Sequence, residues 1–485
     1  MHKVDFDLLA SARQEMLQNG FSPDFPPGTD QQLAALREQG PIGMTSDVRD
    51  LRDLLWSSID NDTSRDLDQI EVAVKIDAGI RVLVGIADVD SDVPAASPID
   101  QHAAQETVTV YTPVKNFPML PEVLSTNLTS LNENEDRLAI VIEFVVDAEG
   151  SIDAQTIYRA RVRNKAQLTY NAVGGWLEGR SAADAKVAAS RDLQAQLRLQ
   201  DQAATALRAQ RHRLGALNFD RVEAVTTVTD GHVSDVQAAQ KTRANDLIED
   251  FMIAANEVMA LTLKQRGASS IRRVVKSPER WPRIVELAAK YGVPLPSNPD
   301  SIALSRFLES RKQADPLHYA DISLAIVKLM GPGEYVMLKA GETGDGHFGL
   351  AAQDYTHSTA PNRRYADLVT QRLIKAVMQG HAAPYSDVEL ASIARNCTLK
   401  EDAARKVERV MAKRVAAVAM QGRIGQQFEA VVTGVTPKGT FVRLLAPPVE
   451  GILWRGQQGV DVGDKFQVTL TATDPQRGYL DFARQ

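Results

Sequence analysis

Residues 58–70 read SIDNDTSRDLDQI and place four aspartates in a short turn between two strand-like runs. Asp66 and Asp68 are two residues apart, so their side chains project from one face of an extended chain. Asp60 can fold back beside them across the loop. Like charges about 4 Å apart repel by roughly 1 kcal/mol in water, and a hard divalent cation relieves that repulsion. The spacing therefore indicates a metal site for phosphoryl chemistry, with a solvated acidic turn as the alternative.

Further blocks occur in a fixed order on both sides of this turn. They lie at residues 50–53, 85–89, 111–113, 118–121, 130–132, 136–139, 251–256, 347–350, 355–357 and 361–368. Together with the aspartates, these blocks resemble the catalytic domain of the ribonuclease II/R (RNB) family over most of residues 48–400. Several ordered blocks are more specific than any single motif.

The resemblance implies a processive 3′→5′ exoribonuclease that hydrolyses single-stranded RNA to nucleoside 5′-monophosphates. Two Mg²⁺ ions, or Mn²⁺ in their place, would polarise the phosphate and activate water. By the same resemblance, Asp60 and Asp66 are metal ligands, and Asp68 is a catalytic residue that binds a metal or orients the terminal ribose. Arg363 would clamp the phosphate, with Arg364 second to it in binding RNA.

Two departures from the family pattern bear on this site. Gln69 stands where the family has a fourth aspartate, so we expect an uncharged metal ligand there. Residues 360–362 read APN in place of the usual Ser-Pro-Ile. Tyr111 matches the family aromatic that stacks on a base near the active end. The alternative function is a catalytically weakened RNB-type RNA-binding protein.

The catalytic domain is expected over residues 48–423, as α+β structure with a mixed sheet and surrounding helices. Alternating apolar residues predict strands within 48–165. Helical periodicity predicts helices at residues 183–212, 242–266, 280–291, 365–379, 388–396 and 400–422.

Residues 424–485 contain five short strand-like runs separated by turns, which predicts a small closed barrel of the OB type. The order of its glycines and aromatics resembles an S1 RNA-binding domain. Phe441 is the expected RNA contact, and Phe428 and Trp454 are further candidate stacking faces.

Residues 1–47 are expected to form a small helical region, with helices at residues 3–19 and 29–37 joined by a proline-rich loop. Two interpretations stay open: a winged helix-turn-helix, or a helical cap on the catalytic domain. The first would also allow a DNA-binding regulator as a third function.

Composition sets the remaining expectations for the 485-residue chain. Its net charge of −7 argues against wholesale coating of nucleic acid but allows a local basic channel. Its candidate walls are Arg363 with Arg364, residues 272–276 and residues 405–414. The single cysteine, Cys397, excludes an internal disulfide. No apolar run is long enough to span a bilayer, so we expect a cytoplasmic monomer without membrane association.

Overall fold

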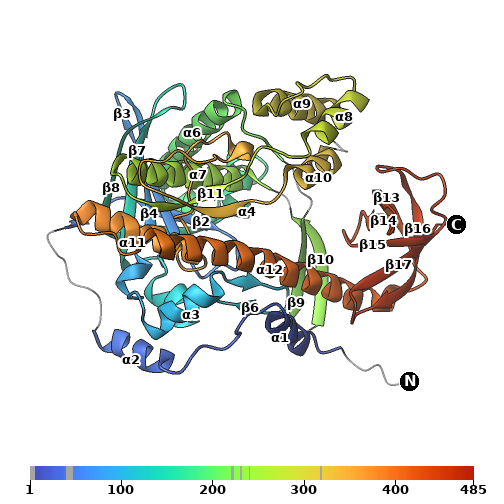
Figure 1. Cartoon of the computed structure of the whole chain (residues 1–485), viewed down its shortest axis with the longest axis horizontal. Coiled ribbons are helices and arrows are strands. Elements are labelled where there is room, and N and C mark those ends of the chain that lie inside the picture. The colour runs from blue at the N-terminus through green and yellow to red at the C-terminus, as the bar shows by residue number, and fades with distance from the viewer. Residues whose placement is uncertain are drawn as a thin grey trace.

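The computed structural model describes residues 6–39, 47–219, 223–229, 232–239, 241–316 and 319–484. A mixed sheet surrounded by helices forms the middle of the chain, and a closed barrel forms its C-terminal end (Figure 1). The predicted α+β class, with a helical N-terminal segment and a C-terminal barrel, is confirmed.

The main sheet carries the acidic turn between two of its central strands. Its order is β1-β8-β2-β3-β4-β7, and the long β8 pairs with β7 along its first part and with β2 along its last part. The sheet therefore curls back on itself. Its strands are β1 (Val48–Asp50), β2 (Trp56–Asp60), β3 (Gln69–Ile76), β4 (Gly79–Ala87), β7 (Asp136–Val146) and β8 (Ile152–Thr169).

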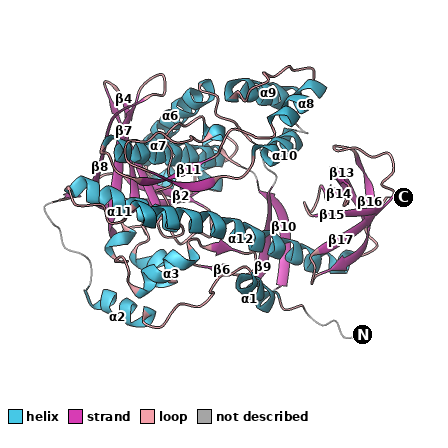
Figure 2. Ribbon diagram, viewed as in Figure 1, coloured by secondary structure: helices cyan, strands magenta, loops and turns pink. Residues whose placement is uncertain are grey.

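The helices pack on this sheet and enclose one large apolar core (Figure 2). The β-branched residues of β4 are almost completely buried, as expected for a central strand covered on both faces. The helices of this body are α3 (Pro98–Glu106), α4 (Tyr170–Leu177), α5 (Ala185–Ala189), α6 (Arg191–Arg213), α7 (Arg243–Gln265), α11 (Tyr365–Gln379) and α12 (Asp387–Met420).

A smaller helical layer with its own apolar core lies beside the barrel (Figure 1). It consists of α8 (Trp281–Lys290), α9 (Ser301–Ala314) and α10 (Tyr319–Met330). The remaining elements are short hairpins and single turns: β5 (Val110–Tyr111), β6 (Asn116–Phe117), β9 (Glu223–Thr229), β10 (His232–Ala239), β11 (Ser270–Val274), β12 (Glu334–Leu338), η1 (Val89–Ser91), η2 (Leu124–Leu128), η3 (Phe348–Leu350) and η4 (Gln421–Arg423).

Two helix predictions differ from the structure. The predicted helix at 183–212 is broken at Ser190, whose hydroxyl accepts from the Leu193 amide and starts α6. The two helices predicted at 388–396 and 400–422 form the single 34-residue α12, because residues 397–399 contain neither glycine nor proline. Figure 1 shows α12 running from the sheet to the barrel.

The barrel closes in the order β13-β14-β15-β17-β16. Its strands are β13 (Gln427–Thr436), β14 (Gly439–Leu444), β15 (Glu450–Arg455), β16 (Lys465–Asp474) and β17 (Tyr479–Ala483). The barrel core continues into the last turn of α12 through Ala417 and Met420. The long helix therefore connects the barrel directly to the sheet body.

The two N-terminal helices lie in different places. α1 (Leu8–Gln18) begins after Asp7, whose carboxylate accepts from the Ala10 amide, and packs its apolar face on α12. α2 (Thr29–Gln39) lies beside α3 instead (Figure 1). Residues 1–5 and 40–46 are outside the described residues.

Within the described parts of the chain, no helix combines the length and the apolar character that crossing a membrane requires.

Candidate active site

The acidic turn is held in place by hydrogen bonds from inside and outside the loop. One carboxylate oxygen of Asp60, at the end of β2, accepts from the Asn61 amide (2.7 Å) and the Ser64 hydroxyl (2.9 Å). The Leu67 amide donates to the Ser130 hydroxyl (3.0 Å), and the Leu67 carbonyl accepts from the Leu131 amide (2.9 Å). The block at residues 130–132 thus positions the turn.

Asp68 is buried at the centre of the site. Its Oδ1 accepts from the Asn362 amide at 3.1 Å, and its Oδ2 lies 3.5 Å from Nε of Arg363. Burial raises the pKa of the Asp68 carboxyl to about 7, although the Arg363 charge opposes the rise. The chain therefore holds a desolvated carboxylate beside a single guanidinium, an arrangement that an added cation would stabilise.

The other two predicted aspartates lie close to Asp68. The charge of Asp66 raises the pKa of both Asp60 and Asp68, which requires it to lie near each of them. Burial is the largest cause of the raised pKa of Asp60. Asp66 therefore lies near both other carboxylates of the turn. That the three bind one metal ion stays a prediction.

The two arginines before α11 differ in exposure. The side chain of Arg363 is 43% exposed, so its guanidinium is open to a ligand. The side chain of Arg364 points inward and pairs with Asp367 at 2.7 Å. Arg363 has the geometry expected of a phosphate clamp, whereas RNA binding by Arg364 stays a prediction.

Tyr111 joins the site from a distant part of the sequence. Its hydroxyl donates to Oδ2 of Asp66 at 3.2 Å, and its ring is 38% exposed. The strand pairing between residues 107–109 and 363–365 brings it there, with the Thr109 amide donating to the Arg363 carbonyl. Tyr111 therefore lies at the edge of the acidic turn and is partly exposed. Stacking of its ring on a base stays a prediction.

Gln69 begins β3, and its amide group is already engaged. Its Nε2 donates to the Ile59 carbonyl at 3.4 Å, and its side chain is buried. Metal binding by Gln69 stays a prediction.

Sequence reasoning missed Glu71, two residues further along β3. This side chain is fully buried, and neither carboxylate oxygen has a hydrogen-bond partner among the described residues. Burial, reinforced by the charge of Asp60, raises its pKa well above the usual range. The available signal was a carboxylate within the otherwise apolar run at residues 70–74.

Part of the predicted basic channel is wrong. Arg272 and Arg273 are buried in β11, and Arg273 forms a two-point ion pair with Glu401 at 2.6 and 3.1 Å. Buried, paired guanidiniums cannot line an open channel. Lys276 is exposed but pairs with Glu334 at 2.7 Å.

The oxygen-rich turn fits a hard divalent cation that is bound jointly with substrate. Among the described residues, no three His, Cys, Asp or Glu side chains form a cage that could hold a metal ion. Mg²⁺ rarely uses such cages and is commonly held by one or two carboxylates, water and phosphate. Asp60, Asp66 and Asp68 supply donors of this kind, and burial of Asp68 favours a positive neighbour.

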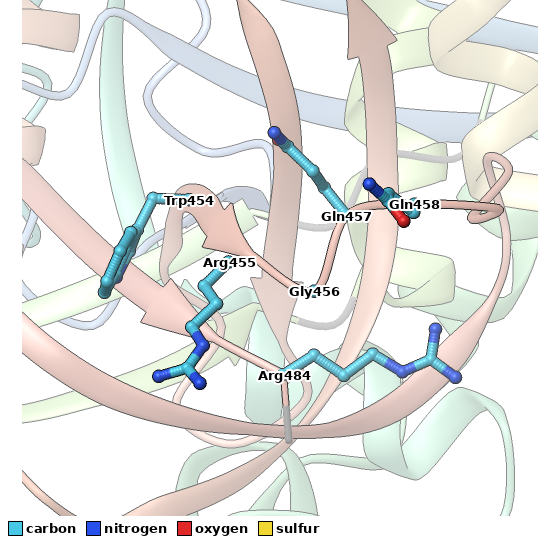
Figure 3. A pocket seen from close by; sticks show the side chains of 6 residues that line it. All are labelled: Trp454, Arg455, Gly456, Gln457, Gln458 and Arg484. Atoms are coloured by element: carbon cyan, nitrogen blue, oxygen red, sulfur yellow. The ribbon is translucent and has the colours of Figure 1, made fainter.

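The barrel carries a second open surface with aromatic and basic groups. Trp454 and Arg484 line a hollow of about 690 Å³ together with residues 455–458. Figure 3 shows Trp454 and Arg455 on one side of Gly456, with the Arg484 guanidinium on the other. Trp454 is 53% exposed and Phe441, on the adjacent strand β14, is half-buried.

Two family profiles match the chain. Residues 48–380 match the RNB domain, and residues 426–485 match the RNase II-type exonuclease C-terminal S1 domain. The Ribonuclease R of Aquifex aeolicus is 30% identical over 441 residues. That alignment covers 88% of this chain but only 61% of the A. aeolicus protein.

Solved structures share the fold at lower identity. The Mycoplasma genitalium RNase R in complex with ribose-methylated single-stranded RNA superposes with a TM-score of 0.86 at 23% identity. It covers 99% of this chain and 78% of its own. Yeast Ssd1, described as a pseudonuclease, superposes with a TM-score of 0.72 at 18% identity, over 97% of this chain and 58% of its own.

Proposed function

Because the chain belongs to the RNB family, we propose that it is a 3′→5′ exoribonuclease acting on single-stranded RNA. It degrades RNA processively and releases nucleoside 5′-monophosphates, with Mg²⁺ as cofactor and Mn²⁺ as a substitute. It works as a cytoplasmic monomer without membrane association.

The observation that carries this proposal is the meeting of Asp66, Asp68 and Arg363 at one point. Two carboxylates from the turn and one exposed guanidinium from the start of α11 come together across almost 300 residues of sequence. Hydrolysis of a phosphodiester requires both kinds of group. Carboxylates hold the cations, and a guanidinium in a fixed position binds the phosphate oxygens.

Each side chain then has a distinct role. When bound, the divalent cations polarise the phosphate and lower the pKa of bound water. Asp60, Asp66 and Asp68 hold these cations, with Gln69 as an uncharged fourth ligand. Arg363 binds the scissile phosphate and stabilises the charge that develops on it.

RNA also binds at two further places, beside the acidic turn and on the barrel. Tyr111 stacks on a base at the reacting end, and its bond to Asp66 fixes the ring beside the metal ligands. Arg364 supports Arg363 from inside. On the barrel, Phe441 and Trp454 offer stacking faces, while the arginines of the hollow in Figure 3 offer phosphate contacts.

A second function, RNA binding with weakened catalysis, is favoured by one observation. Gln69 removes a charge from the expected ligand set, and the described carboxylates form no complete cage. In this alternative, the site binds RNA but holds cations too weakly for efficient hydrolysis.

One experiment separates the two functions. The full chain is incubated with 5′-labelled RNA and, separately, with 5′-labelled DNA of the same sequence, with and without Mg²⁺. An exoribonuclease shortens the RNA from the unlabelled 3′ end only when Mg²⁺ is present. RNA that is bound in a filter assay but stays intact at every Mg²⁺ and Mn²⁺ concentration would instead support the non-catalytic alternative.

A further inference from the structure

Two neighbouring residues of one loop contact both halves of the candidate site. The hydroxyl of Ser130 accepts from the Leu67 amide in the acidic turn at 3.0 Å. The hydroxyl of Thr129 lies 2.6 Å from Oδ1 of Asn362, which directly precedes Arg363 and is 233 positions away in the sequence. The loop is therefore a common support for the turn and for the segment that carries the arginine.

Asn362 is fully buried between this support and the acidic turn. Its side chain has no exposed surface, and its backbone amide donates to Oδ1 of Asp68 at 3.1 Å. Isoleucine, which the family pattern has at this position, could not form the bond to Thr129. Because a buried amide group without a hydrogen-bond partner is costly, the contact with Thr129 decides how well Asn362 is held in place.

The hydroxyl of Thr129 has two acceptors within hydrogen-bond distance, Oδ1 of Asn362 and the Leu124 carbonyl at 2.9 Å. A hydroxyl carries a single proton, so it donates to only one of them. Nδ2 of Asn362 has no partner among the described residues. A half-turn of the amide group exchanges Oδ1 and Nδ2, so that Nδ2 donates to Thr129 while Thr129 donates to Leu124. This orientation forms two hydrogen bonds in place of one.

The backbone at Asn362 determines where the next side chain can reach. The Arg363 carbonyl accepts from the Thr109 amide at 3.0 Å, which fixes the far side of this segment. On the near side, the bond between Asn362 and Thr129 ties the same segment to the support of the turn. The distance of 3.5 Å between Nε of Arg363 and Oδ2 of Asp68 depends on both attachments.

We propose that the side chain of Asn362, through its hydrogen bond to Thr129, positions Arg363 for catalysis. The inference rests on the proposed function, because it takes phosphate binding by Arg363 as given. Asn362 is a positioning residue: its buried side chain does not contact RNA and acts through the backbone that carries the arginine.

The test measures single-turnover rates on 5′-labelled RNA with saturating Mg²⁺ and RNA affinity by filter binding in EDTA. Asn362→Leu and Thr129→Val keep the approximate side-chain shapes and remove the bond from either side. Each should lower the rate about tenfold, because a small displacement of a catalytic group is costly, while the Kd for RNA changes by less than about threefold. The double variant should be about as slow as either single variant, since both remove the same bond. Thr129→Ser keeps the hydroxyl and should keep the rate.

A second comparison shows whether Asn362 acts through Arg363. In an Arg363→Lys background, adding Asn362→Leu should change the rate by less than about twofold, because the group that Asn362 positions is already altered. Thr370→Val is the matched control. Thr370 is fully buried like Thr129, but its hydroxyl donates to the Ala366 carbonyl within α11 at 2.8 Å, so its loss should leave the rate unchanged. Thermal denaturation checks the folding of every variant.

Three results would overturn the inference. The first is a wild-type rate in Asn362→Leu, and the second is a Thr129→Ser variant as slow as Thr129→Val. The third is a loss on Asn362→Leu that persists in full in the Arg363→Lys background, because the residue would then act elsewhere. All three would leave the proposed function standing as long as the wild-type chain cuts RNA. A wild-type chain that cuts no RNA at any Mg²⁺ concentration would remove the proposed function together with the inference.

Discussion

At the scale of single residues, burial and the nearby charge of Asp66 both disfavour the ionised form of Asp68. This carboxyl group is 3% exposed, lies near Asp66, accepts one hydrogen bond from the Asn362 amide and lies 3.5 Å from Arg363. An ordinary aspartate titrates near 3.8, whereas burial raises the pKa of Asp68 to about 7. Without metal, the folded chain therefore keeps a proton on Asp68 that the unfolded chain releases between about pH 4 and pH 7.

This difference predicts a pH-dependent effect of Asp68→Asn on stability. In metal-free wild type, the contribution of Asp68 is lost as pH rises from about 4 to about 7, because the folded state must then ionise a buried group. The asparagine variant has no group to ionise at this position, so its stability does not fall over this pH range for this reason. In EDTA, Asp68→Asn should raise the free energy of unfolding by roughly 4 kcal/mol at pH 8 and by roughly 2 kcal/mol at pH 5, with a correspondingly larger rise in Tm at pH 8. A larger gain at pH 5 would contradict the assignment.

A second residue-scale prediction concerns Arg363. Its planar fork suits two-point contact with a phosphate, and lysine does not reproduce that geometry. Arg363→Lys should lower kcat about 100-fold while RNA affinity falls much less. Single-turnover rates and filter binding measure the two effects, with the exposed Arg395→Lys on α12 as control. Equal losses of rate and affinity would make Arg363 a general RNA contact.

The site residues were predictable to different degrees. Asp66 and Asp68 follow from their two-residue spacing, and Asp60 follows from its place at the other end of the same short turn. Arg363 and Tyr111 come from distant segments, and only the resemblance to a family indicated them. Glu71 was not predicted, because its burial without a hydrogen-bond partner among the described residues depends on tertiary packing.

At the scale of elements, Arg414 of α12 joins three parts of the chain. Its guanidinium donates to Ser11 and Glu15 of α1, each at 2.8 Å, and to the Gln476 carbonyl in the turn before β17 at 2.9 Å. Gly478 of that turn packs so closely on Lys413 and Arg414 that a side chain there would clash. We propose that the N-terminal helical segment is a cap whose helix α1 helps to fix the barrel to α12 through Arg414.

This cap predicts a specific loss on Arg414→Met. The substitution leaves Glu15, which is 7% exposed, without its counter-charge and detaches both α1 and the turn. The free energy of unfolding should fall by roughly 3 kcal/mol. Protease should also cut the segment between α1 and α2 faster. Arg409→Met, at an exposed position of the same helix, is the control, and equal behaviour of the two variants would refute the cap.

The elements show where local reasoning succeeds. The helix predicted at 365–379 coincides with α11, since Gly380 in the left-handed conformation ends it. The gap predicted inside α12 was wrong because a change in apolar pattern does not break a helix that lacks glycine and proline. Residues of α12 pack into both the sheet core and the barrel core, so the helix is continuous between them.

At the scale of the whole molecule, we propose two surfaces for RNA, one at the acidic turn and one on the barrel. The barrel touches α10 through Arg443 and Asp321 at 3.4 Å and continues into α12 through its core. The closed barrel was predictable from five short runs. Its placement was not, because the contacts that set it join residues far apart in sequence.

The division into two surfaces predicts a dependence on RNA length. Phe441→Ala combined with Trp454→Ala should weaken binding of long RNA by about 1–3 kcal/mol for each lost stacking contact. The rate on an oligonucleotide too short to reach the barrel should not change. Tyr479→Ala, which removes another exposed aromatic of the barrel, serves as control. Unchanged affinity for long RNA would show that this face does not hold substrate.

The central claim is that the acidic turn performs hydrolysis. The most direct test compares wild type and Asp68→Asn on 5′-labelled single-stranded RNA with saturating Mg²⁺, together with RNA affinity measured in EDTA. We predict that the variant loses at least about 100-fold in rate while its RNA affinity stays within threefold of wild type. A variant that keeps more than about a tenth of the wild-type rate would contradict the assignment of this turn as the catalytic centre.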